Sequence, residues 1–151
     1  MNKILKNKTI SIVSPCFNEE GNVVNLYNAV LKIMKNQPYK YEHIFIDNSS
    51  TDLTVEKIKN LAKKDKNLKL IVNTRNFGAI RSPYFGVIQS TGDACILIAS
   101  DFQVPPILIN DFIKSWENGF KIVLAKKEST DGNNLFFYAK KKYYSFMQKI
   151  S

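Results

Sequence analysis

Short apolar runs alternate with stretches of helical periodicity along this chain, and this alternation constrains the fold more than any other feature. The apolar runs at 10–14, 44–46, 68–72, 94–98 and 122–125 have the length and composition of buried strands. Helices are predicted at 22–35, at 54–63, from Pro83 to about residue 89, at 106–116, and after residue 125. Strand, helix and strand in repetition predict parallel pairing, so the predicted fold is α/β, a doubly wound, mainly parallel sheet with helices on both faces.

Proline and glycine mark the predicted helix ends. Pro38 ends the first helix, and Pro83 is expected in the first turn of the third, where its missing N–H does no harm. Gly119 is a stop signal for the helix at 106–116.

Composition predicts one globular domain over residues 1–151. Hydrophobic residues make up 44% of the chain, enough for an ordinary core. No apolar run approaches the roughly 20 residues that span a bilayer, and the polar N-terminus is unlike a signal peptide. A cytoplasmic protein is therefore the default expectation. Cys16 and Cys95 each lie in an apolar stretch, and both are predicted to be reduced, buried thiols.

The chain is strongly basic, with 22 Lys and Arg against 13 Asp and Glu and a net charge of +9. Lysines interleave with aromatic residues in the tail at 121–149. Two interpretations stay open for this tail: a basic, aromatic helix at the inner face of a membrane, or a solvated helix face. No nucleic-acid-binding module is present, so we expect no nucleic-acid partner.

Several common catalytic and cofactor motifs are missing. Neither a Gly-rich dinucleotide fingerprint nor a Walker A sequence follows the first predicted strand. His43, the only histidine, lies inside a predicted strand and is interpreted as a strand residue rather than a general base. A Ser-His-Asp hydrolase is therefore unsupported.

Polar residues follow each predicted strand, where doubly wound sheets bind their ligands. These residues are Pro15, Asn18, Glu19 and Glu20, then Asp47, Asn48 and Ser49, then Asn73, Arg75, Asn76 and Gly78, and finally Asp101 and Gln103. Their convergence at one edge of the sheet predicts a binding site.

Four of these runs appear in a familiar order. They are Ser14-Pro15-Cys16-Phe17-Asn18-Glu19-Glu20, Asp47-Asn48-Ser49-Ser50-Thr51-Asp52, Arg75-Asn76-Phe77-Gly78, and Gly92-Asp93 through Asp101-Phe102-Gln103-Val104-Pro105-Pro106. With them the chain resembles, over residues 10–150, a family 2 glycosyltransferase with the GT-A fold, closest to the dolichol- and polyprenyl-phosphate sugar transferases.

The resemblance implies roles for the strand-end residues. Pro15, Phe17, Asn18 and Glu19 correspond to the first nucleotide-binding loop, and Asp47 to the carboxylate that reads the base edge. Arg75, Asn76 and Gly78 correspond to the loop beside the nucleotide and diphosphate. Other interpretations stay open: Glu19 and Glu20 as acids at a helix N-terminus, and Arg75 or Arg81 as surface residues. Asp52 with Thr51 is interpreted as a helix cap.

The resemblance also implies a divalent metal, Mg²⁺ or Mn²⁺, on the sugar diphosphate. The family's DxD signature reads Ala99-Ser100-Asp101 here, so its first carboxylate is missing. Asp101 and Gln103 match the metal-contacting pair, and we expect weakened metal binding because one anionic ligand is gone. A purely structural Asp101 is the alternative.

By the same resemblance, Arg81, Lys126 and Lys127 are candidates for contact with an acceptor phosphate, and a solvated lysine run is the alternative. The implied activity is transfer of a sugar from a nucleotide-diphosphate sugar to a polyprenyl-phosphate or glycan acceptor in cell-envelope synthesis. The family's acceptor-side segment is missing from these 151 residues. A non-catalytic nucleotide-sugar-binding module is therefore the second hypothesis.

Overall fold

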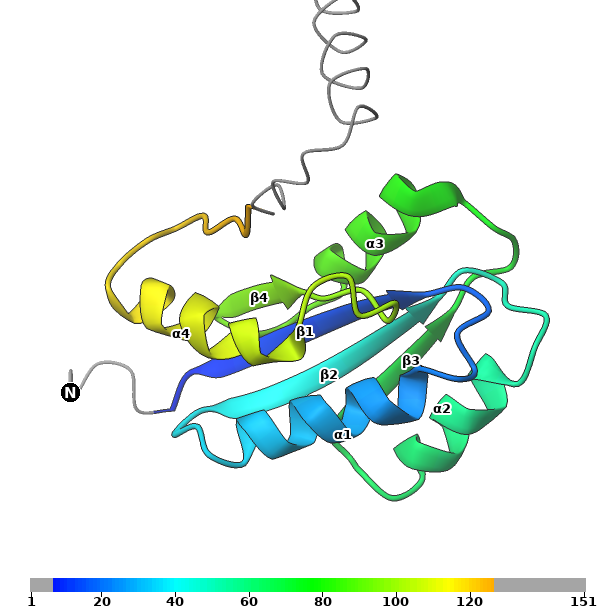
Figure 1. Cartoon of the computed structure of the whole chain (residues 1–151), viewed down its shortest axis with the longest axis horizontal. Helices are drawn as coiled ribbons and strands as arrows, with labels where there is room; N and C mark the ends of the chain where they lie inside the picture. Colours follow the sequence, from blue (N-terminus) through cyan, green and yellow to red (C-terminus); the bar gives the residue numbers. More distant parts are fainter. Residues whose placement is uncertain (1–6, 127–151) are drawn as a thin grey trace, which may run out of the picture.

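Four parallel strands form the sheet in the computed structural model, which describes residues 7–126 (Figure 1). The strands are β1 (Thr9–Cys16), β2 (Lys40–Asp47), β3 (Leu68–Val72) and β4 (Ala94–Leu97). Their order in the sheet is β3-β2-β1-β4, and every neighbouring pair is parallel. This arrangement confirms the predicted α/β fold and aligns the carboxyl ends of the strands at one edge.

Helices cover both faces of this sheet unequally. The helical elements are α1 (Val23–Met34), α2 (Thr54–Ala62), α3 (Gly78–Ile88), the short 3₁₀ helix η2 (Pro106–Leu108) and α4 (Ile109–Glu117). Residues of α1, α2 and α4 pack into one large core, whereas α3 lies on the opposite side of the sheet (Figure 1). No helix within residues 7–126 is long and apolar enough to cross a membrane.

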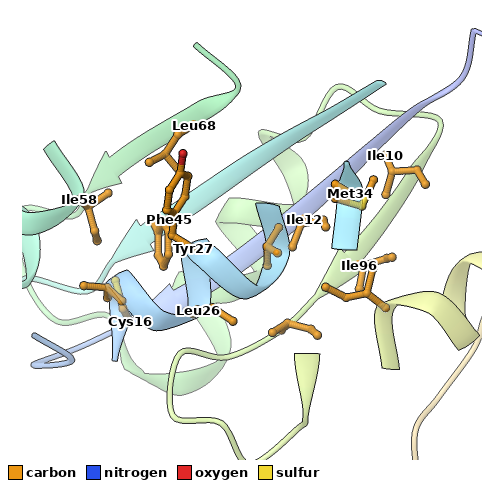
Figure 2. Close-up of a cluster of buried hydrophobic side chains, with 14 of the residues drawn as sticks. Ile10, Ile12, Cys16, Leu26, Tyr27, Met34, Phe45, Ile58, Leu68 and Ile96 are labelled. Carbon is orange, nitrogen blue, oxygen red and sulfur yellow. The ribbon is translucent and has the colours of Figure 1, made fainter. Parts of the chain in front are cut away.

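The large core explains why α1 forms where it does. Its buried residues recur at helical spacing and meet alternate residues of the strands, as Figure 2 shows for Leu26, Tyr27 and Met34. Ile12 and Phe45 face them from β1 and β2 and are completely buried. Burial of a large aliphatic or aromatic side chain contributes about 1.5–3 kcal/mol, so this cluster dominates the stability of the fold.

The opposite face has a much smaller core, made of Val13, Ile44 and Ile46 with Ile71 packed against them. Helix α3 approaches this face through Ser82 and Gly86, which are both buried. A Cβ atom placed on Gly86 would lie 2.8 Å from Cγ1 of Val13. Only a glycine allows α3 to pack this closely against the sheet.

His43 is buried in the large core, as expected for a strand residue. Its Nε2 lies 3.0 Å from Oγ of Ser14, and its ring packs 4.4 Å from that of Phe45, measured between centroids. Burial lowers the pKa of His43 to about 3. The imidazole is therefore neutral at ordinary pH and lies away from solvent.

The position of Pro83 differs from the prediction. Helix α3 begins at Gly78, so Pro83 lies inside it rather than in its first turn. The helix starts earlier because side chains fix its first backbone amides: Asn76 accepts the Gly78 N–H at 2.8 Å, and Asn48 accepts the Phe77 N–H at 2.9 Å. These bonds supply the partners that the first turn of a helix lacks.

The predicted fifth strand at 122–125 is wrong, because these residues form no strand and are exposed. Strand β4 is an edge of the sheet in the part of the chain that the structure describes, and residues 122–125 run across a cleft from β4 without pairing with it. The same open edge leaves Cys95 exposed, contrary to expectation, whereas Cys16 is buried as predicted. The helix predicted after residue 125, the aromatic tail and Lys127 lie outside the described residues.

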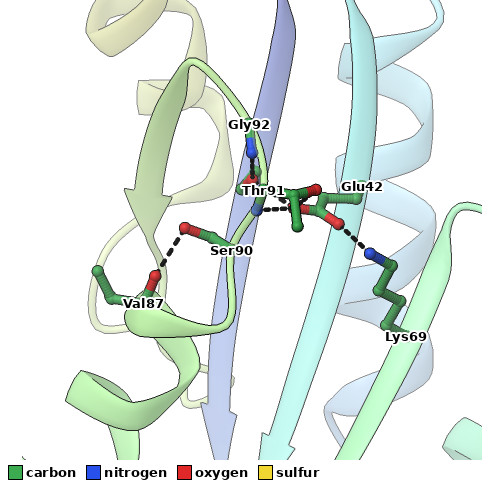
Figure 3. A network of polar contacts seen from close by, with 7 residues as sticks. Glu42, Lys69, Val87, Ser90, Thr91 and Gly92 are labelled. Carbon is green, nitrogen blue, oxygen red and sulfur yellow. Dashed lines mark hydrogen bonds and ion pairs between the residues drawn. The ribbon is translucent and has the colours of Figure 1, made fainter.

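A buried carboxylate ties the amino ends of the strands together (Figure 3). Glu42 on β2 accepts hydrogen bonds from the Ser11 hydroxyl at 2.6 Å and from the backbone of Thr91 at 2.6 Å, and it pairs with Lys69 on β3. Burial alone would raise the pKa of Glu42, but these bonds outweigh it and lower the pKa to about 2. The charged form of Glu42 therefore stabilises the sheet.

We predict that Glu42→Gln lowers the free energy of unfolding by roughly 2 kcal/mol at pH 7, because the pair with Lys69 loses its charge. The folded-state pKa lies below the ordinary value of 4.5, so the carboxylate contributes fully above that pH. The difference between the two proteins should shrink as the pH falls from 4.5 towards 2. Urea unfolding followed by circular dichroism measures it.

Glu56→Gln serves as the control, since Glu56 is an exposed acid on α2. It should leave the free energy of unfolding within about 0.5 kcal/mol of the original value. Equal effects of the two substitutions would contradict a special contribution from Glu42.

Candidate functional site

A cleft of about 480 Å³ opens at the carboxyl edge of the sheet, where the predicted motifs meet. Its lining residues come from the ends of β1, β2 and β4 and from the start of α3. They are Pro15, Cys16, Phe17, Glu19, Asn48, Asn76, Gly78, Ala79, Ser82, Pro83, Ala99, Ser100 and Asp101. The fold therefore brings together residues from all four sequence motifs.

A larger cleft of about 610 Å³ lies between β4 and the segment from α4 to Ala125. Its walls are mainly apolar, with Asp93 and Lys121 as the charged residues. Ligand sites need convergent polar groups as well as space, so the smaller cleft is the candidate site.

The first loop of the site is fastened to the second by backbone-to-side-chain hydrogen bonds. Asn18 has a left-handed backbone, with φ of 54°, and its side chain accepts the Thr51 N–H at 2.8 Å. The Glu19 N–H donates to the Thr54 hydroxyl at 2.8 Å, and Asp52 accepts the N–H groups of Glu20 and Thr54. The N-cap residue of α2 is Leu53, so Asp52 lies one position before it, although its carboxylate accepts the N–H of Thr54, the first residue of α2. Thr51 donates to Asn18 and takes no part in capping the helix.

Asp47 is completely buried at the end of β2 and does not line the cleft. One carboxylate oxygen accepts the Ser50 N–H at 2.9 Å, and the other accepts the Ser50 hydroxyl. The Cys16 thiol lies beside it, and burial, followed by the charge of Asp47, raises the pKa of Cys16. Asp47 therefore shapes the second loop, and its contact with a nucleotide base stays a prediction.

Asn48 organises the wall of the cleft around the start of α3. Its side-chain oxygen accepts from the Phe77 N–H at 2.9 Å and from the Asn73 amide at 3.2 Å. Its side-chain nitrogen donates to Oδ1 of Asn76 at 2.8 Å. The loop at 75–78 thus takes its conformation from an amide that acts as donor and acceptor at once.

The predicted cationic residues lie outside the lining of this cleft. Arg75 is exposed and stacks on the Phe77 ring, with Cζ 4.9 Å from the centroid. Arg81 is exposed on α3, and Lys126 is exposed at the end of the described chain. Their contacts with phosphate groups stay predictions.

Asp101 lines the cleft, and the segment that follows it forms a tight turn. Its carboxylate accepts the Gln103 N–H at 3.1 Å across Phe102, whose φ is 57°. Gln103 is exposed and lies outside the cleft lining. No group of three or more Asp, Glu, His or Cys side chains in residues 7–126 is arranged to hold a metal ion.

A metal that the protein and its substrate hold together still fits this site. Mg²⁺ keeps several water ligands and needs one or two carboxylates beside substrate phosphates, and Asp101 supplies a hard oxygen at the cleft. Ala99, in the position of the missing acid, lines the same wall without contributing a ligand.

Sequence reasoning assigned no function to Ser82 and Ser100, which line the cleft. It placed Asn48 among the polar residues that follow the strands, but the contacts that Asn48 makes depend on a loop far along the chain. Ser100 is buried in the cleft wall, and its hydroxyl has no hydrogen-bond partner in the described structure.

The sequence profile described as "Glycosyl transferase family 2" matches residues 11–150. The chain belongs to this family of glycosyltransferases. Among the family's curated members, the bactoprenol glucosyl transferase of Shigella phage SfX is 39% identical over 125 residues, which cover 82% of this chain and 41% of that protein. The chain spans about two fifths of the length of the curated relatives it matches, from 39% to 44% for the first of them.

Solved glycosyltransferases share the fold. Residues 1–349 of Staphylococcus aureus TarS, in complex with UDP-GlcNAc, match with a TM-score of 0.63 and 22% identity over 84% of this chain and 36% of that solved chain. A mannosyltransferase from Pyrobaculum calidifontis, in complex with GDP-Man and Mn²⁺, matches with a TM-score of 0.50 and 21% identity over 63% of this chain and 28% of that protein. These similarities confirm the GT-A fold of this family 2 glycosyltransferase domain.

We predict that Asn48→Asp destabilises the domain by about 2 kcal/mol at pH 7, because a carboxylate cannot donate to Oδ1 of Asn76 and its charge would be buried. Burial raises the pKa of the new acid above that of a free aspartate, because burial disfavours the charged form. Protonation then restores one donor, so the loss should be largest at neutral pH and shrink as the pH falls below the raised pKa. Urea unfolding at pH 7 and pH 4.5 tests this.

Asn28→Asp provides the matched control, since Asn28 is an exposed residue of α1. Its effect should stay within about 0.5 kcal/mol at both pH values. A pH-independent loss at Asn48 would show that the donor role assigned to its amide is wrong.

Proposed function

We propose that this domain binds the nucleotide-diphosphate sugar of a family 2 glycosyltransferase in the 480 Å³ cleft. The observation that carries the proposal is that Pro15, Phe17 and Glu19 line the same cleft as Gly78 and Asp101. These residues come from separate motifs, and the parallel sheet unites them at its carboxyl edge. The family resemblance assigns the same positions to the sugar donor.

The donor's parts fit different parts of the cleft. Phe17 is exposed and offers an aromatic surface for a base, while Glu19 offers a carboxylate that accepts hydrogen bonds from base or ribose hydroxyl groups. Gly78, with φ of 84° and open space at its Cβ position, lets a diphosphate approach the backbone. Arg75 and Asn76 border the same loop, where a guanidinium binds phosphate oxygens well.

Asp101 and Gln103 are the side chains we assign to the divalent metal, Mg²⁺ or Mn²⁺. A metal held there would offset the negative charge of the diphosphate leaving group. The missing acid at Ala99 leaves the donor phosphates and water to complete the coordination, so metal affinity without the nucleotide should be weak.

The acceptor we infer is a polyprenyl phosphate, with a glycan hydroxyl as the alternative. The relative from phage SfX carries bactoprenol in its name, which supports the lipid acceptor. A phosphate oxygen is already a nucleophile and attacks the anomeric carbon as the nucleotide diphosphate leaves, so no strong base is required. Arg81, Lys126 and Lys127 are the cations proposed to contact the acceptor phosphate.

We predict that the full chain binds UDP or GDP, or their sugar conjugates, more tightly with Mg²⁺ or Mn²⁺ than without. Asp101→Asn should remove most of this metal dependence, because the amide lacks the anionic oxygen that hard cations prefer. The expected loss in metal-dependent affinity is about tenfold or more, measured by isothermal titration calorimetry.

Asp111→Asn is the matched control, because Asp111 is an exposed acid in the first turn of α4. This variant should bind the nucleotides with the same metal dependence as the unmodified chain. Metal-dependent affinity that survives in Asp101→Asn would refute the metal assignment. A folded chain that binds none of these nucleotides would refute the proposed function.

The second candidate is a binding module without transferase activity, which the alanine at position 99 favours. Both candidate functions predict nucleotide binding, but only the first predicts transfer of the sugar to an acceptor. Incubation with a radiolabelled nucleotide sugar and polyprenyl phosphate separates them, since only the enzyme yields labelled lipid.

A further inference from the structure

Helix α3 carries its large apolar side chains on the side that faces away from the sheet. Ile80 is 83% exposed, Tyr84 66% and Ile88 56%, and Phe77 and Phe85 are exposed beside them. At about 100° per residue these positions fall on one face of the helix. We call this set, Phe77, Ile80, Tyr84, Phe85 and Ile88, the α3 stripe.

The stripe follows from how α3 packs. The sheet receives the small residues Ser82 and Gly86, and Gly86 allows no side chain between the helix and Val13. Because this packing fixes the rotation of α3 about its axis, the helix face opposite Ser82 and Gly86 points to solvent. Contiguous exposed apolar surface on a soluble domain usually marks an interaction site.

The positive charges in and beside the α3 stripe favour a partner with negative charge. Arg81 lies within the stripe and Arg75 stacks on Phe77 at its end, whereas α3 contains no Asp or Glu. Arginine side chains place their stems on apolar surface and their guanidinium groups at phosphate level. Aromatic and branched side chains mixed with arginine, without acids, are typical of a helix that lies in a membrane interface.

We propose that the α3 stripe is a docking surface for a lipid bilayer with anionic headgroups. The apolar side chains enter the acyl boundary, while Arg81 contacts headgroup phosphates. This goes beyond the proposed donor-binding function and rests on exposed side chains outside the cleft lining.

The position of the stripe relative to the cleft suits this docking. Gly78 and Ala79 line the cleft, and the stripe continues along the same helix from Ile80. A bilayer against α3 would therefore lie beside the cleft entrance and leave the opposite face, with α1 and α2, in water (Figure 1).

Co-sedimentation of the full chain with vesicles tests the proposal, using phosphatidylcholine with and without phosphatidylglycerol. The double substitution Ile80→Gln and Ile88→Gln should weaken vesicle binding about tenfold or more, because two apolar groups no longer enter the bilayer. Arg81→Gln should reduce the gain from phosphatidylglycerol while keeping the apolar contribution.

Leu53→Gln with Ile107→Gln is the matched control, since these side chains are 53% and 62% exposed and belong to other elements, the N-cap of α2 and η2. It should bind vesicles like the unmodified chain, and circular dichroism should show all variants folded. Equal vesicle binding by the α3 double variant and the control would overturn the proposal. So would absence of vesicle binding by the unmodified chain, or a dimer in solution that the α3 substitutions dissociate. Calorimetric titration of the same variants with nucleotide measures binding in the cleft, so failure of the membrane proposal can be told apart from failure of the proposed donor binding.

Discussion

The parallel register of β1 against β2 is the constraint on which the rest of this structure depends. It places Cys16 beside Asp47, so both strands reach the carboxyl edge together. The two loops that follow then lie close enough to exchange hydrogen bonds through Asn18, Thr51 and Asp52. A shift by one residue would reverse the side chains of a whole strand and remove the cleft together with the core.

Hydrogen bonds organise both ends of the sheet, but with different groups. At the amino edge, the buried carboxylate of Glu42 holds Ser11, Thr91 and Lys69. At the carboxyl edge, the neutral amide of Asn48 holds the loop that starts α3. A negative charge at position 48 would repel an anionic ligand in the cleft, so a neutral amide is better suited to hold this loop beside a diphosphate.

The sequence predicted the elements that local periodicity and apolar composition determine. Strand β3 at 68–72 agrees with its prediction residue for residue, and α1 differs only at its ends. The prediction failed where long-range contacts decide: α3 begins at Gly78 because Asn48 and Asn76 fix its first amides. Residues 122–125 resemble a strand but have no ladder partner among the described residues. For the site, motif order pointed to residues that line the cleft, such as Phe17, Glu19 and Asp101, but gave no sign that Asp47 is completely buried.

The two faces of the sheet show how one helix can serve packing and interaction at once. On the face with α1, the large side chains point inwards, and the core hides them from any partner. On the other face, Gly86 and Ser82 bring α3 close to Val13 and Ile46, and the large side chains are left for the outside. A larger residue at 86 would move α3 away from the sheet, and it would displace the α3 stripe and the Gly78 wall of the cleft together. Helix packing therefore couples the position of the proposed membrane surface to the shape of the proposed donor site.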